Sequence, residues 1–316
     1  MGASNRPARP SVVTPGNYDG VHLGHRALIR AAREQADRLG PETDVVALTF
    51  YPHPLALIAP DRAPQLLTTP ERRVELLRAA GADRVHIQAF DRAFSSLTPE
   101  AFAREVLVEE LGARAVVVGQ DFCFGAGRSG NVSVLQQLGE ALGFEVCIVQ
   151  PVHFQGAVAS SSRVRKALGQ GNVELAAQLL TRVHDVTRRV VSGNKRGRTI
   201  GVPTANLELT GLMPPADGVY AVCARILTPG RDPRRLGGVA NLGVRPTLKA
   251  GRSMEVHLFD FEGDLYDCTL RVGFVSRLRG EQKFASLEAL REQIACDMIE
   301  AKSAVERCDE SLLAWI

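Results

Sequence analysis

GNYDGVHLGH, residues 16–25, is the segment that decides the fold of the first half of the chain. It follows a short apolar run at 11–14 and opens a helical pattern over 23–39. Its glycines allow a tight turn, and His22 and His25 share one face of the first helical turn. Because a helix N-terminus favours anions, two imidazoles there predict hydrogen bonds to a reacting phosphate. A glycine turn with two surface histidines is the alternative interpretation.

Outward from this segment, short β-branched runs alternate with helical patterns. The alternation predicts an α/β domain, in which helices cover both faces of a parallel sheet. Ligands bind such sheets beyond the carboxyl ends of the strands, so the loops after Thr14, Phe50 and Val118 are the predicted site. The predicted strands are 11–14, 45–50, 85–88, 115–118 and 144–149, and the predicted helices are 23–39, 70–80, 99–111 and 132–142.

Two of these loops carry further candidates. In FYPHP, residues 50–54, His53 follows a strand end between two prolines that fix its loop. In VGQDFCFG, residues 118–125, Asp121 is suited to orienting a metal-bound nucleotide, and Phe122 to packing against a flat ring. An ordinary turn with core aromatic residues is the alternative for the second loop.

SSSRVR, residues 160–165, opens another helical run. Serine suits the N-cap of a helix, and the hydroxyls of Ser161 and Ser162 together with Arg165 are suited to holding a polyphosphate. Serine caps are common, so a plain helix start is an equally good interpretation of this segment alone.

The second half has a different texture. Strand-like runs separated by Gly, Pro and Asp turns precede one long helical pattern, which predicts a small antiparallel barrel with a terminal helix. We place the domain boundary between 184 and 185, giving domains 1–184 and 185–316. The predicted strands are 186–192, 218–226, 236–242, 254–261 and 265–274, and the predicted helix is 286–308.

GNKRGRTIGVPTAN, residues 193–206, is basic and glycine-punctuated. Backbone N–H groups and nearby cations can cradle phosphates. Thr204 and Asn206 face the same side of an extended segment, and their oxygens suit Mg²⁺ alongside phosphate oxygens. The order of residues is not that of a Walker loop, and a basic hairpin loop is the alternative. The phosphate candidates here are Gly193, Lys195, Gly197, Arg198 and Gly201.

MEVHL, residues 254–258, alternates as a strand does, so Glu255 and His257 share one face. A carboxylate beside an ATP site can accept the proton of an attacking hydroxyl in phosphoryl transfer. A solvated polar strand face is the alternative interpretation of the same pattern.

Composition excludes several classes of protein. With 316 residues, 45% hydrophobic and 23% charged, the chain is expected to be globular with about two domains. Neither a membrane helix nor a secretory signal is predicted. A net charge of +3 without a basic run argues against nucleic-acid binding. Six scattered cysteines without a CxxC pair indicate reduced thiols and a cytoplasmic location.

The motifs of the first half resemble those of one known family. HxGH at a strand-to-helix turn is similar to the nucleotidylyltransferase superfamily. GNYDGVHLGH, TFYPHP, VGQDFCFG and SSSRVR, in this order, resemble the prokaryotic bifunctional riboflavin kinase/FMN adenylyltransferases, also called FAD synthetases. GNKRGRTIGVPTANLEL, DGVYAV, GVANLGVRPT, MEVHLFDFEGDLYD and LRGEQKF resemble the kinase module of the same family, so the resemblance spans roughly residues 10–300. Departures from the family pattern occur at Pro15, Tyr18, Ser162, 181–184, Arg188 and Asp267.

The resemblance implies a Rossmann-like nucleotidylyltransferase domain, then a kinase barrel, and two consecutive reactions. ATP would phosphorylate riboflavin to FMN, and a second ATP would adenylylate FMN to FAD with release of pyrophosphate. FMN and FAD would be products rather than redox cofactors. The catalytic residues would be His22, His25 and Glu255, and Thr204 and Asn206 would bind Mg²⁺. Nucleotide contacts would include Gly16, Asn17, Asp19, Gly24, Asp121, Ser161, Ser162 and Arg165, and flavin contacts Phe50, His53, Pro54, Phe122, Arg279 and Phe284.

Two alternatives stay open at this point. In the first alternative, only the FMN adenylyltransferase half is active. In the second, the chain is a non-catalytic flavin-binding protein. The expected partners are riboflavin, FMN and ATP, and neither nucleic acid nor a membrane is expected as a partner. A weak homo-oligomer stays open.

Overall fold

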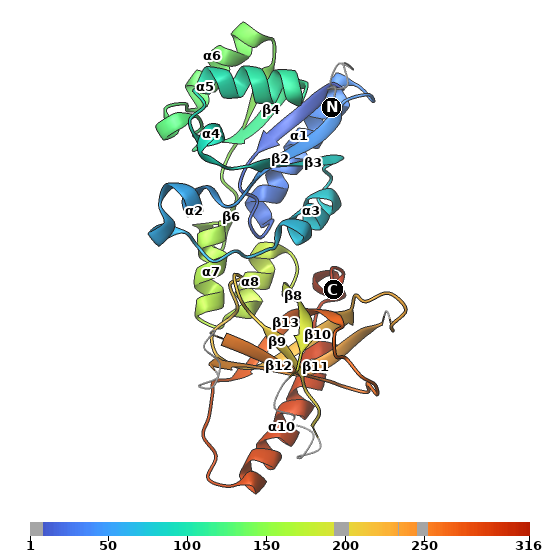
Figure 1. The fold of residues 1–316 in the computed structure, drawn as a ribbon. Helices are drawn as coiled ribbons and strands as arrows, with labels where there is room; N and C mark the ends of the chain where they lie inside the picture. Colours follow the sequence, from blue (N-terminus) through green and yellow to red (C-terminus); the bar gives the residue numbers. More distant parts are fainter. Residues whose placement is uncertain (1–8, 193–201, 233, 245–251) are drawn as a thin grey trace. The chain divides into compact units, whose positions relative to one another are not determined.

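The computed structural model describes residues 9–192, 202–232, 234–244 and 252–316, and Figure 1 shows its fold. Contacts divide the chain into two compact units, Met1–Ser160 and Ser161–Ile316. Five phosphate candidates lie outside the described residues, namely Gly193, Lys195, Gly197, Arg198 and Gly201. Among the described residues, no helix combines the length and the apolar character needed to cross a bilayer.

The first unit is built on a parallel five-stranded sheet, which confirms the predicted α/β class (Figure 1). Its strand order is β3-β2-β1-β4-β5, so β1 lies at the centre between β2 and β4. The order reverses next to β1, which is where ligands bind in sheets of this kind. The strands are β1 Ser11–Pro15, β2 Asp44–Tyr51, β3 Arg84–Ala89, β4 Ala113–Gly119 and β5 Glu145–Val149.

Helices cover both faces of this sheet. Val13, Val116 and Val118 join one core cluster with residues of η2 and α6. Because successive strand side chains point to opposite faces, the fully buried Val12 and Val117 line the other face. The helices are α1 Leu23–Leu39, α2 Pro54–Ile58, η1 Pro60–Arg62, α3 Pro70–Ala79, α4 Arg92–Ser95, α5 Pro99–Ala101, η2 Phe102–Glu110, η3 Ala126–Arg128 and α6 Val132–Leu142. A two-stranded hairpin, β6 His153–Phe154 and β7 Ala157–Val158, ends the unit.

The second unit holds a closed antiparallel barrel, as the sequence predicts (Figure 1). Its strand order around the barrel is β10-β11-β12-β9-β8-β13. The strands are β8 His184–Val191, β9 Ala205–Glu208, β10 Gly218–Ile226, β11 Arg235–Val244, β12 Arg252–Leu258 and β13 Thr269–Arg279. The helices are α7 Ser161–Gly169 and α8 Val173–Leu180 before the barrel, and α10 Leu287–Glu306 and α11 Glu310–Leu313 after it.

Two predicted strand ranges of the barrel are wrong at their ends. The strand predicted over 265–274 is β13, which begins only at Thr269. The backbone is left-handed at Asp267, with φ of 64°, and Cys268 donates to the Leu265 carbonyl, so this stretch is a turn. A left-handed residue at Asp260, with φ of 51°, likewise follows the end of β12.

The barrel interior and its outer face are distinguished by alternation along β12. Met254 and Val256 are almost completely buried, whereas Glu255 and His257 between and after them are partly exposed. On the outside, α10 packs across β10, β11 and β13. Glu255 therefore lies on the outer face of the barrel.

The helices α7 and α8 belong to the barrel unit by their contacts. They pack against each other, α8 also packs against β8 and β13, and Ala216 donates a 2.8 Å hydrogen bond to the Leu168 carbonyl. The boundary predicted between 184 and 185 thus falls inside the second contact unit, which begins at Ser161.

Candidate active sites

The three loops singled out from the sequence follow neighbouring strands. Because β2, β1 and β4 lie side by side and parallel, Gly16, Tyr51 and Gly119 stand at one edge of the sheet. The Gly16 amide continues the pairing by donating to the Leu48 carbonyl at 2.9 Å. The carboxyl edge of the sheet therefore gathers the predicted loops.

His22 forms the N-cap of α1. Its Nδ1 accepts a 3.1 Å hydrogen bond from the Gly24 amide, which fixes the neutral ring with its proton on Nε2. A Cβ at Gly24 would lie 3.2 Å from the His22 ring and 3.3 Å from the Ala159 carbonyl. Position 24 therefore favours glycine because the imidazole and the backbone approach it closely.

His25 lies directly against His22. The two rings stack with centroids 3.6 Å apart, and the edge of Tyr18 packs on His25 at 5.1 Å. Its Nδ1 is buried without a hydrogen-bond partner among the described residues. Burial lowers the pKa of His25 well below its usual value, and repulsion from a protonated His22 and from the charge of Arg73 lowers it further. His25 is thus suited to act as a neutral hydrogen-bond donor at pH 7.

Gly16 and Tyr18 pack against each other below the histidines. Tyr18 is completely buried, and its hydroxyl donates to the Thr14 carbonyl at 3.0 Å and lies 2.6 Å from the Thr14 hydroxyl. A Cβ at Gly16 would lie 3.1 Å from the Tyr18 ring. The larger side chain at a position where the family usually has Phe is therefore accommodated with its hydroxyl bonded.

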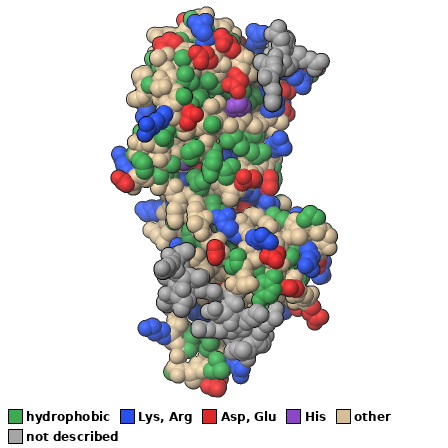
Figure 2. Space-filling view, viewed as in Figure 1, with side chains coloured by type: hydrophobic (Ala, Val, Ile, Leu, Met, Phe, Trp, Pro, Cys, Tyr) green, Lys and Arg blue, Asp and Glu red, His purple; other side chains and the backbone are tan. Residues whose placement is uncertain are grey.

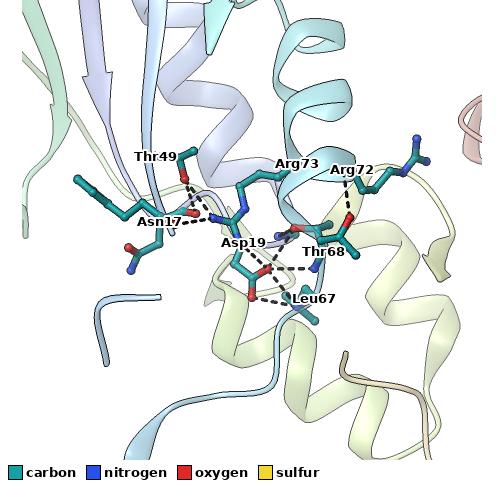
Figure 3. Close-up of polar contacts among 10 residues, drawn as sticks. Asn17, Asp19, Thr49, Leu67, Thr68, Arg72 and Arg73 are labelled. Carbon is teal, nitrogen blue, oxygen red and sulfur yellow. Dashed lines mark hydrogen bonds and ion pairs between the residues drawn. The ribbon is translucent and has the colours of Figure 1, made fainter. Parts of the chain in front are cut away.

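Asp19 points into the protein rather than toward solvent (Figure 3). Its carboxylate accepts hydrogen bonds from the Leu67 amide at 2.9 and 3.0 Å, and from the amide and hydroxyl of Thr68 at 3.0 and 3.1 Å. Arg73 lies 3.7 Å away. In this arrangement Asp19 fixes the loop before α3, and its predicted contact with nucleotide stays a prediction.

Asn17 and His53 sit at the ends of β1 and β2. The Asn17 carbonyl accepts from the Thr49 hydroxyl at 3.0 Å, and its side chain is exposed. His53 caps α2 with Nδ1, which accepts from the Leu55 amide at 3.2 Å, and Pro54 fills the first helical position. His53 repeats the cap of His22 at the neighbouring strand, so in its neutral form its proton is on Nε2 as well.

The aromatic candidates belong to the core below this edge. Phe50 packs edge-on against Phe90, with ring centroids 5.9 Å apart. Phe122 stacks on Phe124 at 5.4 Å. Asp121, one residue before Phe122, is exposed just beyond the end of β4. The loop after β4 therefore offers a carboxylate at the surface and an aromatic stack behind it.

Ser161, Ser162 and Arg165 lie in the first two turns of α7, as the sequence predicts. This helix is part of the second contact unit. Their predicted contacts with a polyphosphate stay predictions.

On the barrel, strand register aligns the kinase candidates. Glu255 pairs directly with Asn206 on β9 and with Asn241 on β11. Asn241 pairs with Val219, and Val219 with Arg279 on β13. Because directly opposite residues share a face, Asn206, Glu255 and Asn241 form a continuous polar row on the outside of the barrel.

His257 anchors the segment that precedes this row. Its Nδ1 donates to the Pro203 carbonyl at 2.8 Å, next to Thr204. Thr204 directly precedes β9, and Asn206 within β9 pairs with the carboxylate-bearing Glu255 on the next strand. Hard oxygen ligands of this kind fit Mg²⁺ bound to phosphate. No group of three His, Cys, Asp or Glu side chains suited to a metal occurs within the described ranges.

Arg279 is held by the terminal helix. Its guanidinium contacts both oxygens of the buried Asp297 on α10, at 2.8 to 3.1 Å, and lies 5.6 Å from the centre of the Phe284 ring. Arg279 and Phe284 thus form one cluster at the end of the row, but no ligand contact follows from this alone.

Two departures from the family pattern have structural explanations. His184 is buried, donates from Nε2 to the Met213 carbonyl at 3.0 Å and stacks 6.0 Å from Phe274. Arg188 donates to the carbonyls of Glu208 and Thr210, tying β8 to the end of β9. Both residues therefore fit the barrel.

Three residues of these sites could not be predicted from any pattern in the sequence. Arg73 lies in a helix whose pattern is ordinary, and Asp297 is an acidic residue in the middle of α10. Asn241 could be recognised only if the pairing of β11 with β12 were known.

A separate cavity of about 750 Å³, lined by residues that include Leu39, Thr43 and Arg114, contains none of the predicted site residues.

Comparison with known proteins covers both halves of the chain. The family model for FAD synthetase matches residues 4–163, and the model for riboflavin kinase matches residues 180–305. Proteins named bifunctional riboflavin kinase/FMN adenylyltransferase are 42% identical in Escherichia coli, covering 95% of this chain and 94% of that protein, and 42% identical in Pseudomonas fluorescens, covering 93% of each.

A solved structure is also similar over nearly the whole chain. A protein from Streptococcus pneumoniae, described as a macrolide-efflux protein, matches with a TM-score of 0.81 and 33% identity over 93% of both chains. The resemblance seen in the motifs is confirmed by these matches. The chain belongs to the family of bacterial bifunctional riboflavin kinase/FMN adenylyltransferases.

Proposed function

We propose that this chain catalyses two successive transfers from ATP. The barrel phosphorylates the ribityl 5′-hydroxyl of riboflavin, giving FMN and ADP. The parallel-sheet domain joins FMN to the AMP part of a second ATP, giving FAD and pyrophosphate. The observation that carries the proposal is the joint presence of the His22–His25 stack and the Asn206–Glu255 pair in one chain that matches both family models.

In the adenylyl transfer, a phosphate oxygen of FMN attacks the α-phosphorus of ATP, and the bond to the β-phosphate breaks. Negative charge develops on the α-phosphate oxygens as this happens. Neutral imidazoles that carry a proton on Nε2 can donate to those oxygens, which is the role assigned to His22 and His25. The motif pattern assigns the leaving pyrophosphate to Ser161, Ser162 and Arg165, and the nucleotide to Asp121.

In the phosphoryl transfer, the ribityl oxygen attacks the γ-phosphorus and its proton passes to Glu255. The strand register, which sets Glu255 between Asn206 and Asn241, supports this role. Thr204 and Asn206 would hold Mg²⁺, which supplies charge neutralisation at the phosphates when bound. FMN leaves as product and becomes the substrate of the other domain.

The substrates are then riboflavin, FMN and ATP, and a reducing cytoplasm is the proposed location. All six cysteines are free thiols, which agrees with such a location. Acidic and basic side chains are interspersed over the face shown in Figure 2, as suits a small net charge. A weak homo-oligomer stays a prediction.

A product assay tests the proposal and its two alternatives. The full chain is incubated with riboflavin, ATP and Mg²⁺, and FMN and FAD are resolved by chromatography. We expect both products, with FMN appearing first. FAD from added FMN but no FMN from riboflavin would leave only the adenylyltransferase, and no product from either substrate would leave a flavin-binding protein.

A further inference from the structure

Arg73 is a buried cation at the edge of the sheet where the histidines lie. Only 2% of its side chain is exposed, and it comes from the first turns of α3, which begins at the Thr69 N-cap and Pro70. Burying a guanidinium is unfavourable unless charges and hydrogen-bond acceptors surround it. Arg73 must therefore be held by specific partners.

These partners come from two separate segments (Figure 3). The Nη1 atom donates to the Thr49 hydroxyl and to the Phe50 carbonyl, both at 3.2 Å, at the end of β2. The Nη2 atom lies 3.7 Å from the Asp19 carboxylate. Thr49 in turn donates to the Asn17 carbonyl at 3.0 Å. Arg73 thus pairs with Asp19 within the turn that precedes His22 and is linked to Asn17 at its start through the Thr49 hydroxyl.

The turn that carries Asp19 and Gly20 is also hydrogen-bonded to the loop before α3. Asp19 accepts from the amides of Leu67 and Thr68, and the Thr68 hydroxyl accepts from the Gly20 amide at 3.3 Å. The turn at residues 17–20 is therefore fixed from two sides by groups that are almost fully buried. Loss of one member would leave the others uncompensated.

We propose that Arg73 is a positioning residue of the adenylyl-transfer site, which holds the turn before His22 and His25 in place and keeps His25 in its neutral form. This rests on the role proposed above for the two histidines. Arg73 does not contact the reacting atoms in this arrangement and acts through Asp19, Asn17 and the histidines.

Charge supports the second part of this role. Among the described residues, His25 has ring contacts with the titratable His22 and Tyr18 and feels the charge of Arg73, which in turn pairs with Asp19. The positive charge of Arg73 lowers the pKa of His25, in addition to burial and to His22. Without Arg73, protonation of His25 should begin at higher pH, and a doubly protonated ring cannot stack on His22 as favourably.

The test uses the full chain and four variants. Arg73→Met removes charge and hydrogen bonds, Arg73→Lys keeps the charge but not the planar fork, and Thr49→Val removes one link with little change in shape. Arg72→Met is the matched control, because Arg72 is the next residue of α3, is also buried, and directs its guanidinium to Glu75 at 2.7 Å. FAD formation from added FMN is measured against pH, with FMN formation from riboflavin as the internal control.

We expect Arg73→Met to lower kcat for FAD formation about 100-fold, the scale of a small misplacement of catalytic groups, with KM for ATP little changed. The acid limb of its pH profile should move to higher pH, and Arg73→Lys should restore that limb without restoring kcat. Arg72→Met and FMN formation should stay near wild type. If Arg73→Met does not fold, Thr49→Val should still lower kcat about tenfold.

Equal losses in Arg73→Met and Arg72→Met, or an unmoved acid limb, would overturn the proposal, because a merely structural role predicts both. If Arg73→Met is unfolded, a Thr49→Val enzyme with wild-type kcat would do the same. His25→Ala is measured in parallel. Its inactivity beside an active Arg73→Met would reject only the role of Arg73, whereas an active His25→Ala would reject the histidine assignment itself.

Discussion

The two sites are constructed in opposite ways. In the parallel-sheet domain, His25 packs against the buried Tyr18, and the turn before the histidines is held by the buried Asp19 and by Arg73 of α3. On the barrel, Asn206, Glu255 and Asn241 stand in one row that strand pairing sets up on a partly exposed face. A buried site depends on distant groups that hold it, whereas a register row depends on the local strands. Substitutions around the histidine site should therefore affect groups at a distance, whereas the effects of substitutions around the barrel row should stay local.

The largest effect is expected for Glu255→Gln. The amide keeps shape and hydrogen bonding but removes the acceptor for the ribityl proton. Loss of a general base typically lowers a rate by about 10²- to 10⁴-fold, so kcat for FMN formation should fall by that factor. Steady-state kinetics with riboflavin and ATP measures it. FAD formation from added FMN should persist, and a near wild-type kinase rate would leave Glu255 as a solvated strand residue.

His25→Ala should have the next largest effect. Removing one donor to a developing oxyanion typically lowers kcat by about 10²- to 10³-fold, and FAD formation from FMN should fall accordingly. FMN formation from riboflavin should not change, because that chemistry is assigned to the barrel. Loss of both activities in a folded protein would contradict two separate sites.

The extent of the kinase module gives a comparison of two fragments. Residues 185–316 keep the barrel but lose α7, α8 and the buried Val183 and His184. Each large buried apolar side chain contributes about 1.5–3 kcal/mol, so 161–316 should be the more stable fragment by several such contributions. Thermal unfolding of both fragments measures the difference. Equal melting temperatures would place the functional boundary at 185, as predicted from the sequence.

A smaller effect is expected from pH. Because the pKa of His25 is lower in the folded than in the unfolded chain, the unfolded chain binds more protons below about pH 6.5. Stability of the first domain should thus be highest above that pH and fall toward acid, by at most about 1.4 kcal/mol per pH unit from this group. Melting temperatures of wild type and His25→Asn between pH 7 and 5 test it. Parallel curves would show that His25 does not contribute.

The same contrast explains what the sequence could predict. Helical period gives α1 with its exact observed bounds, 23–39, and alternation places Glu255 and His257 on one face. Both signals are local. The identity of the strand opposite Glu255 is not a local property, so the sequence does not predict Asn241. The sequence also does not predict the turn at Asp267, so the start of β13 is predicted too early. Arg73 and Asp19 meet from positions 54 residues apart, and no local pattern encodes such a pair.

Mixing two variants that each lack one of the two activities tests the central claim of two separable sites most directly. His25→Ala should convert riboflavin only to FMN, and Glu255→Gln should form FAD only when FMN is added. FMN released by the first enzyme can diffuse to the second. With riboflavin, ATP and Mg²⁺, the mixture should therefore form FAD while neither variant does so alone. Absence of FAD from the mixture, with each variant folded and active in its own half-reaction, would contradict two independent sites joined by free FMN.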